Sequence, residues 1–337
     1  MQIKTCHPPL LPIKHLEYKK IISVLGEARD AIARLDEKIL QEKQSRIILE
    51  PLFWQESISS LRSQNIHTIF QEVMLVRFAG IASEKRSALI EKIISAKEAL
   101  DYTVKERNKK IGEQLFCHIH RIIKKNSTYT RDIGRIRDRQ NWIGPEGCKI
   151  EEAYFYPPLA KRIRPLLRNL ESYLAKQDLD PLLQIAIAFA QFLIIHPFMD
   201  GNGRVARMLV PVCAFRKKLM NLPALLLSEY FETHREDYFQ KLFHISEHDD
   251  WEDWIVFFLA GAISQAKKTR CRIDALAKLW HDTVKLSSEK QAKLLFCQPL
   301  VERGSKVITD KLIREKFLIA QGEEHFFFEP LIRAMRD

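Results

Sequence analysis

The chain has 337 residues, of which 46% are hydrophobic and 29% charged, as expected of a folded globular protein with one large or two to three smaller domains. Its formal net charge of +11 permits acidic partners such as nucleotides or nucleic acid, although a generally basic surface explains it equally well. The six cysteines show no C-x-x-C pair or other metal-binding spacing, which argues against a cysteine zinc site and favours free thiols in a reducing, cytoplasmic setting.

The first third of the chain is predicted to be helical. Apolar residues recur at spacings of three and four over 17–41 and again, in pieces, over 76–123. Pro51 opens a further helix through the stretch PLFWQESISSLRS. We therefore expect an N-terminal helical region over 1–100, followed by a core over 101–270.

A segment of different character lies at 132–158. Its sequence, DIGRIRDRQNWIGPEGCKIEEAYFYPP, is punctuated by Gly and Pro and carries aromatic and β-branched residues at its edges. Such edges, separated by turn residues, favour a short β-hairpin or flap.

The apolar stretch LLQIAIAFAQFLII at 182–195 is predicted to be a buried helix. Asp180 followed by Pro181 is a sound helix start, because the acid caps the helix and proline is tolerated at its first position. The stretch is too short to span a bilayer and contains two glutamines, so we expect no membrane partner. Pro197 lacks the N–H needed to continue a helix, which places the helix end near His196. A second helix is expected from about Gly203.

The loop between these two helices has the composition of a phosphate site. Glycines at 201 and 203 permit a positive φ and leave no Cβ between the backbone amides and a ligand. The following helix offers its first unpaired N–H groups and its positive dipole end to the same point. Arg204 and Arg207, three residues apart, could clamp a polyphosphate with their guanidinium groups.

Two further side chains of the loop suit group transfer. Asp200 has the wrong charge to touch phosphate, but a carboxylate beside a phosphate site usually holds Mg²⁺. His196 lies at the rim, where a neutral imidazole can take a proton from an incoming hydroxyl. Phe198 is expected to point into the core and pin the loop. Each element alone is more often a cap, a turn or a solvated face, and their coincidence in twelve residues carries the interpretation.

The chain changes character after the basic run KKTRCR at 267–272. A helix, a short strand, a turn at Gly322 and the strand HFFFE predict a winged-helix-like unit over 275–337. Its segment SKVITDKLIREK alternates basic and apolar residues, so a DNA-binding regulator acting through this unit is the alternative function. A degenerate wing used for dimerisation is equally consistent with the sequence.

The stretch HPFMDGNGRVAR at 196–207 resembles, without a gap, the Fic (Fic/Doc) signature His-x-Phe-x-Asp/Glu-Gly-Asn-Gly-Arg-x-x-Arg. The resemblance implies a mainly α Fic-type helical bundle with a short β-hairpin flap, to which the small C-terminal winged-helix-like α/β segment is added. It also implies an adenylyltransferase that moves AMP from ATP to a Ser, Thr or Tyr hydroxyl of a target protein. On this resemblance the general base is His196, the Mg²⁺ ligand is Asp200, the anion nest is Gly201, Asn202 and Gly203, and the ligands of the β- and γ-phosphates are Arg204 and Arg207.

Two other stretches resemble parts of the same family. RQNWIG at 139–144, followed by FYPP at 155–158, is similar to the flap, on which a target segment would dock by β-augmentation through Asn141, Trp142, Ile143 and Gly144. LSEYFETHREDYFQKL at 227–242 is similar to the segment that approaches the nucleoside, with a histidine in place of the usual asparagine. We place Tyr238 and Gln191 near the nucleotide, with ordinary core packing as the alternative for Tyr238.

A third stretch bears on control. SLRSQN at 60–65, in a helix over about 56–72, is similar to the family's inhibitory motif Ser/Thr-x-x-x-Glu-Gly/Asn. Gln64 stands where the family has a glutamate that pairs with the second motif arginine, here Arg207. The resemblance implies a weakened brake at Ser60, Gln64 and Asn65. The alternative is that Ser60 and Asn65 are polar groups on a helix surface.

Related activities remain open at this point. Some relatives remove AMP with the help of the inhibitory glutamate, which Gln64 cannot replace as a base. Others transfer other nucleotides or phosphocholine, and the undamaged phosphate nest favours a nucleotide here. Relatives are often dimers, so a homodimer is left open, as is nucleic acid binding by the basic C-terminal region.

Overall fold

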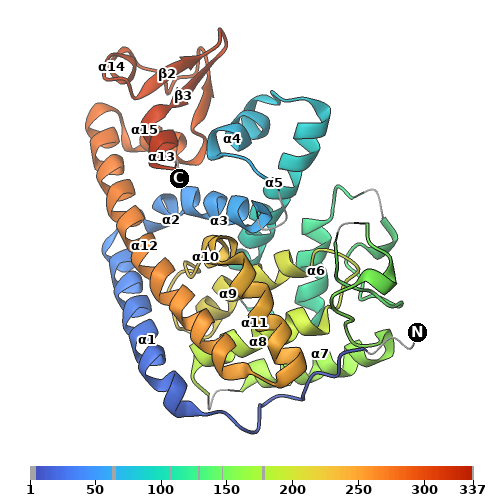
Figure 1. The fold of residues 1–337 in the computed structure, drawn as a ribbon. Helices are drawn as coiled ribbons and strands as arrows, with labels where there is room; N and C mark the ends of the chain where they lie inside the picture. The colour runs from blue at the N-terminus through green and yellow to red at the C-terminus, as the bar shows by residue number, and fades with distance from the viewer. Residues whose placement is uncertain are drawn as a thin grey trace.

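The computed structural model describes residues 5–62, 66–106, 108–127, 130–145, 147–176 and 179–335. Two long helices run beside each other along one side of the molecule (Figure 1): α1 (Tyr18–Gln41) and α12 (Trp251–Leu286). The helix expected over 17–41 is confirmed: Ile21, Ile32, Leu35 and Ile39 recur on its buried side, and the helix packs against α12. α12 has 36 residues and continues through the basic run at 267–272, so the expected boundary near 275 falls inside a single helix.

The core is built around α8 (Pro181–Ile195), which is buried on nearly all sides. The Asp180 carboxylate accepts hydrogen bonds from the amides of Leu182 and Leu183 at 2.8 and 3.1 Å, so the predicted cap is confirmed. The helix ends one residue before His196, as the following proline requires. Its two neighbours in the chain, α7 (Ala160–Ala175) and α9 (Asn202–Arg216), pack directly against α8. Two more helices, α5 (Glu84–Lys105) and α6 (Glu113–Ile123), pack against α9.

An aromatic cluster joins α8 to the helices that follow the loop. Phe189 of α8 lies 5.1 Å from Phe231 and 5.8 Å from Trp254, measured between ring centroids. These rings come from α10 (Ser228–Thr233) and α12, and α11 (Arg235–His248) adds Tyr238. Large buried rings contribute much apolar area, so this cluster holds α8 against α10, α11 and α12.

A central helix, α3 (Glu50–Arg62), follows α2 (Ser45–Ile48) and is buried from Pro51 to Leu61. It packs against α5, α9 and α10 and also against the C-terminal unit (Figure 1). Its buried face carries polar side chains, at Gln55, Glu56 and three serines, which an ordinary core helix would avoid. α4 (Phe70–Ala79) then leads to α5, whose start is capped by the Ser83 hydroxyl.

The flap segment forms a looser hairpin than the sequence predicts. Ile143 and Phe155 make one antiparallel bridge, and the rest consists of turns with two short 3₁₀ helices, Thr130–Asp132 and Ile150–Glu152. Side chains explain the short ladder: Gln140 donates to the carbonyl of Pro157, and the Asn141 side chain accepts from the amide of Trp142. These bonds replace strand pairing.

The C-terminal unit contains a three-stranded antiparallel sheet in the order β1-β3-β2. The predicted strand, turn and strand are confirmed, with Gly322 at φ 67° between β2 and β3. The candidate recognition segment contains a helix of only five residues, α14. The elements are α13 (Glu289–Cys297), β1 (Leu300–Glu302), α14 (Asp310–Arg314), β2 (Leu318–Gln321), β3 (His325–Phe328) and α15 (Glu329–Ala334). Across the described ranges, none of the helices has both the length and the apolar character that crossing a membrane requires.

Candidate active site

The loop from His196 to Gly201 turns the chain between α8 and α9. His196 ends α8 with φ 50° and Gly201 starts α9 with φ 82°, both in the left-handed region. At Gly203 the approach is close for a different reason, since a Cβ there would lie 3.0 Å from Nη1 of Arg207 and the guanidinium would have to shift. The two glycines therefore bring the backbone amides and the guanidinium close together, as the sequence predicts.

The imidazole of His196 is held as one neutral tautomer. Its Nδ1 lies 3.2 Å from the carbonyl oxygen of Leu193. Because a carbonyl only accepts, Nδ1 carries the proton and Nε2 keeps a free lone pair. Burial, aided by the charge of Arg137, lowers the pKa of His196 to about 4. The ring is thus unprotonated at neutral pH, as a general base must be.

Asp200 is the acid of the loop, and its carboxylate is largely exposed. Oδ1 accepts the amide of Gly201 at 2.6 Å, and Oδ2 accepts the ammonium of Lys124 at 2.6 Å. Partial desolvation by the surrounding protein acts to raise the pKa of this carboxyl, but Arg204 and Lys124 outweigh it and lower the pKa to about 2. Asp200 is therefore ionised throughout the working range of pH.

The donor set fits a hard divalent cation that is carried with phosphate. Carboxylate oxygen is the ligand that Mg²⁺ prefers, and Mg²⁺ commonly binds one or two carboxylates together with substrate phosphates. Within the described ranges, no group of three or more His, Cys, Asp or Glu side chains could form an all-protein metal cage. Asp200 alone would hold the ion, and phosphate oxygens and water would complete its coordination.

Arg204 is buried with a donor left open. Only 3% of the residue is exposed, and its nearest charged partner is Asp200, with 3.5 Å between Nη2 and Oδ2. Its buried Nε has no hydrogen-bond partner in the part of the chain that the structure describes. A buried guanidinium with an unsatisfied N–H is costly, so this group indicates an anion-binding position.

Arg207 is held by the central helix. Its Nε donates to the hydroxyl of Ser60 and its Nη2 donates to the carbonyl of the same residue, both at 2.7 Å. The Tyr238 hydroxyl also lies within hydrogen-bonding reach of the guanidinium. Tyr238 is 4% exposed and belongs to the aromatic cluster, so it supports Arg207. Ser60 is thus fully buried against the loop, and it is not a surface group.

Glu56 lies one helical turn before Ser60 and ties the central helix to α10. Its carboxylate accepts the hydroxyl of Ser228 at 2.6 Å and the amide of the same residue at 3.2 Å. Burial raises the pKa of Glu56 to about 7, against the opposing effect of Ser228 and Arg207. Gln64 and Asn65, the other two residues of the inhibitory-like motif, lie outside the described residues.

Two predicted nucleotide residues direct their side chains to the protein itself. The Asn202 amide closes the loop, accepting the Phe198 amide at 2.9 Å and donating to the Phe198 carbonyl at 2.8 Å. Gln191 is buried in α8 and donates to the carbonyl of Pro9 at 2.8 Å. Asn202 can offer a ligand its backbone amide at the start of α9, whereas Gln191 anchors the N-terminal segment.

The flap residues are fastened to the loop. The Asn141 side chain donates to the carbonyls of Phe198 and Met199 at 3.3 and 3.0 Å. Trp142 is 36% exposed, and Ile143 makes the bridge described above. Gly144 is required because a Cβ there would lie 2.6 Å from the Cys148 sulfur. The arrangement leaves the flap beside the loop, where an extended target segment could reach it.

Three side chains near the loop are not signalled by the local sequence. His120 donates from Nε2 to the Asp200 carbonyl at 2.9 Å and accepts the Gly134 amide at Nδ1, also at 2.9 Å. Its ring stacks on Phe198 with 4.0 Å between centroids. Arg137 donates to the His196 carbonyl at 2.9 Å, and Lys124 binds Asp200. Only their three-dimensional neighbours reveal their roles, because each lies at least 59 residues from its partner.

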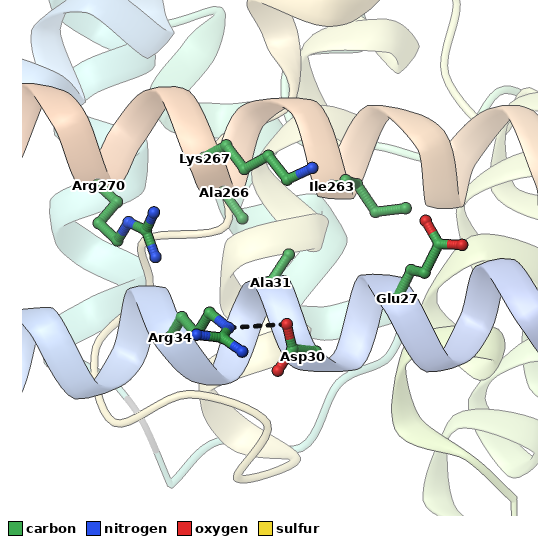
Figure 2. A pocket seen from close by; sticks show the side chains of 8 residues that line it. All are labelled: Glu27, Asp30, Ala31, Arg34, Ile263, Ala266, Lys267 and Arg270. Carbon is green, nitrogen blue, oxygen red and sulfur yellow. Dashed lines mark hydrogen bonds and ion pairs between the residues drawn. The ribbon is translucent and has the colours of Figure 1, made fainter.

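A hollow of about 310 Å³ lies between α1 and α12, and Figure 2 shows the side chains that line it. Acidic and basic side chains line it together, and Arg34 donates to Asp30 at 2.8 Å. None of its lining residues belongs to the loop at 196–207. The candidate site is therefore defined by the loop, α3 and the flap.

Residues 110–214 match the Fic/DOC family. Protein adenylyltransferase fic-1 of Caenorhabditis elegans is 30% identical over 105 residues, which are 30% of this chain and 19% of that protein. Protein adenylyltransferase Fic of Nematostella vectensis is 24% identical over 251 residues, 73% of this chain and 54% of that protein. The match thus spans about a fifth of the nematode relative and about half of the other.

Solved structures share the fold over most of the chain. A Fic family protein from Desulfovibrio desulfuricans G20 superposes with a TM-score of 0.65 at 19% identity, covering 95% of this chain and 98% of that one. Residues 134–508 of Fic-1 from C. elegans superpose with a TM-score of 0.57 at 16% identity, covering 74% and 72%. At these identities the likeness concerns the fold alone.

Proposed function

Because this chain is a Fic family protein whose family domain spans residues 110–214, we propose that it is a protein adenylyltransferase. It would transfer AMP from ATP to a Ser, Thr or Tyr hydroxyl of a target protein. The observation that carries the proposal is the neutral His196 beside an ionised Asp200 and a buried Arg204 with an open donor. A base, a metal-holding acid and an anion position are the three parts that nucleotidyl transfer requires.

In the proposed reaction His196 removes the proton of the target hydroxyl. Nε2 accepts that proton, because Nδ1 already donates to the Leu193 carbonyl. The hydroxyl oxygen forms a bond to the α-phosphorus of ATP, and the bond from that phosphorus to the bridging oxygen of the β-phosphate breaks. Pyrophosphate leaves with the bonding electron pair. The flap orients the target segment through main-chain bonds and tolerates varied side chains.

The phosphates would bind at the start of α9. The backbone amides of Asn202 and Gly203 belong to the first turn of α9, the Gly201 amide is bonded to Asp200, and the open Nε of Arg204 would supply a charged donor. Asp200 would hold Mg²⁺, which when bound neutralises charge on the phosphates. Nε and Nη2 of Arg207 are bonded to Ser60, so α3 would hold these two donors back from a γ-phosphate without a glutamate.

The removal of AMP and the DNA-binding alternative have less support. Gln64 has no carboxylate with which to activate water, which disfavours removal. Binding of duplex DNA would rest on α14, whose five residues make little more than one turn of helix. Nucleotidyl transfer therefore remains the proposed function.

Incubation of the full chain with labelled ATP and Mg²⁺, followed by mass spectrometry of the protein and of lysate proteins, tests the proposal. We expect AMP on the protein itself or on target hydroxyls. His196→Ala should lower transfer by roughly 10²–10⁴-fold and leave nucleotide binding in place. His248→Ala, at an exposed histidine of α11, is the matched control and should transfer like the unaltered protein. Equal rates in both variants would remove His196 from the mechanism.

A further inference from the structure

Lys124 is the C-cap residue of α6, and its ammonium lies in the position where a cation would bind Asp200. Its Nζ lies 2.6 Å from Oδ2, while Oδ1 is occupied by the Gly201 amide. Because Oδ1 is taken by that amide, a metal that binds this carboxylate would use Oδ2 and meet the Lys124 ammonium there. Mg²⁺ binds oxygen at about 2.0–2.1 Å, which brings it within a few ångström of Nζ.

The charges around Asp200 already exceed what one carboxylate balances. Lys124 and Arg204 both contact Oδ2, at 2.6 and 3.5 Å, and give this cluster a net charge of +1. A divalent cation would raise that charge to +3 before any phosphate arrived. Only one-fifth of the Lys124 side chain is exposed, so water screens the repulsion between ammonium and metal less than it would at an open surface.

We propose that Lys124 competes with the divalent cation for Asp200 and thereby sets how much metal the nucleotide site requires. The inference rests on the proposed function, because the competition matters where a phosphate-bearing ligand brings its metal. With no metal bound, Lys124 neutralises Asp200 and keeps this carboxylate from repelling phosphate. With metal bound, the ammonium must leave Oδ2, and its flexible four-carbon stem allows it to do so.

The proposal predicts two effects of opposite sign for Lys124→Met. Without metal, nucleotide affinity should fall about tenfold, because the charge-assisted contact between Lys124 and Asp200 is lost. The Asp200 charge is then no longer neutralised and repels the phosphates. When Mg²⁺ is present, the Mg²⁺ concentration for half-maximal nucleotide binding should fall about tenfold, because the ammonium of Lys124 no longer competes for Asp200. A purely structural role for Lys124 would weaken both kinds of binding.

The test is calorimetric titration of the full chain with a non-hydrolysable ATP analogue, first in EDTA and then at stepwise Mg²⁺ concentrations. Lys124→Arg keeps the charge and should retain a high metal requirement. Lys125→Met is the matched control, since Lys125 is the next residue and pairs with Glu98 instead. Thermal melts check that each variant folds, and Lys124→Gln provides a second neutral variant.

The outcomes distinguish the competition by Lys124 from the proposed function. Opposite shifts in Lys124→Met or Lys124→Gln, absent from Lys125→Met, support the competition. Nucleotide binding with an unchanged metal midpoint, or weakened in both conditions, overturns the inference and leaves the proposed function standing. Failure of the unaltered protein to bind the analogue with or without Mg²⁺ overturns both.

Discussion

At the scale of single residues, the tautomer and the protonation state of His196 are set by its surroundings. The Leu193 carbonyl selects the tautomer, and burial keeps the ring neutral. Arg137 supports the same residue from the flap side by donating to its carbonyl. In the proposed reaction the base would thus be prepared before any substrate arrives, which avoids the cost of reorganising it during the reaction.

The pKa of His196 sets the expected pH dependence of AMP transfer. Because burial lowers that pKa from 6.5 to about 4, the imidazole gains its proton only in strongly acidic solution. The single-turnover rate at saturating nucleotide should stay constant from about pH 8 to about pH 5 and fall through a midpoint near 4. Nucleotide binding measured at each pH is the control. A midpoint near 6.5 would contradict the geometry described here.

Motif residues could be predicted from the sequence because their spacing is local. His196, Asp200 and the two arginines occupy one loop and one helical turn. His120 and Lys124 could not be predicted, since they reach Asp200 across 80 and 76 residues and nothing adjacent marks them. Tyr238 and Gln191 were ambiguous for the same reason: Tyr238 approaches Arg207 of α9, and Gln191 bonds to the Pro9 carbonyl of the N-terminal segment.

At the scale of elements, α3 controls the second motif arginine through Ser60. Ser60→Ala removes the acceptor of Nε and leaves the carbonyl contact in place. We expect α3 to hold Arg207 less firmly and nucleotide affinity to rise about tenfold or more, since a charge-assisted hydrogen bond contributes roughly 1.5–3 kcal/mol. Calorimetry with a non-hydrolysable ATP analogue measures the change. Ser57→Ala, on the same buried helix but bonded to the Phe53 carbonyl, is the control.

Gln64 follows Ser60 by four residues in the sequence, and its substitution tests the motif. Gln64→Glu would offer Arg207 a carboxylate, which should lower the fraction of sites able to seat a γ-phosphate by roughly tenfold. Gln64→Gly should give little further activation. Auto-modification rates of the three forms at equal ATP decide the matter. A large activation by glycine would mean that the amide itself inhibits, and indifference to glutamate would mean that position 64 does not reach the site.

Element boundaries followed the sequence where a cap or a proline defined them. α8 begins at the Asp180 cap and ends before Pro197, so both ends were predictable. The basic run at 267–272 suggested a boundary but lies within α12, since a run of charges on a long helix is compatible with a solvated face. The flap was predicted as a hairpin but pairs at one bridge, because side chains take up its backbone groups.

At the scale of the whole molecule, α3 lies between the helical core that carries the loop and the C-terminal unit (Figure 1). On one side it holds Arg207, and on the other it packs against α13. α12 forms the continuous link between the same two parts. A structural change in the C-terminal unit can therefore reach the loop through α3.

Phe296 tests this connection. Its ring lies 5.4 Å from Trp280 and 5.7 Å from Phe328, joining α13 to α12 and β3. Phe296→Ala should cost about 3–5 kcal/mol in the free energy of unfolding, measured with urea, and should also raise nucleotide affinity by loosening α3. Leu294→Ala is the control, because Leu294 lies on the same helix and is 38% exposed. Destabilisation without any change in affinity would show that the two parts are not coupled.

The contact between Arg207 and Ser60 has one more consequence, for the end of α3. The Ser60 carbonyl is one of the last four of that helix, so the guanidinium serves as a cationic cap where the helix dipole is negative. Withdrawal of the guanidinium toward a triphosphate would take this cap away. The final turn of α3 is then expected to fray, and its amide hydrogens should exchange with solvent faster when the nucleotide is bound than when the site is free.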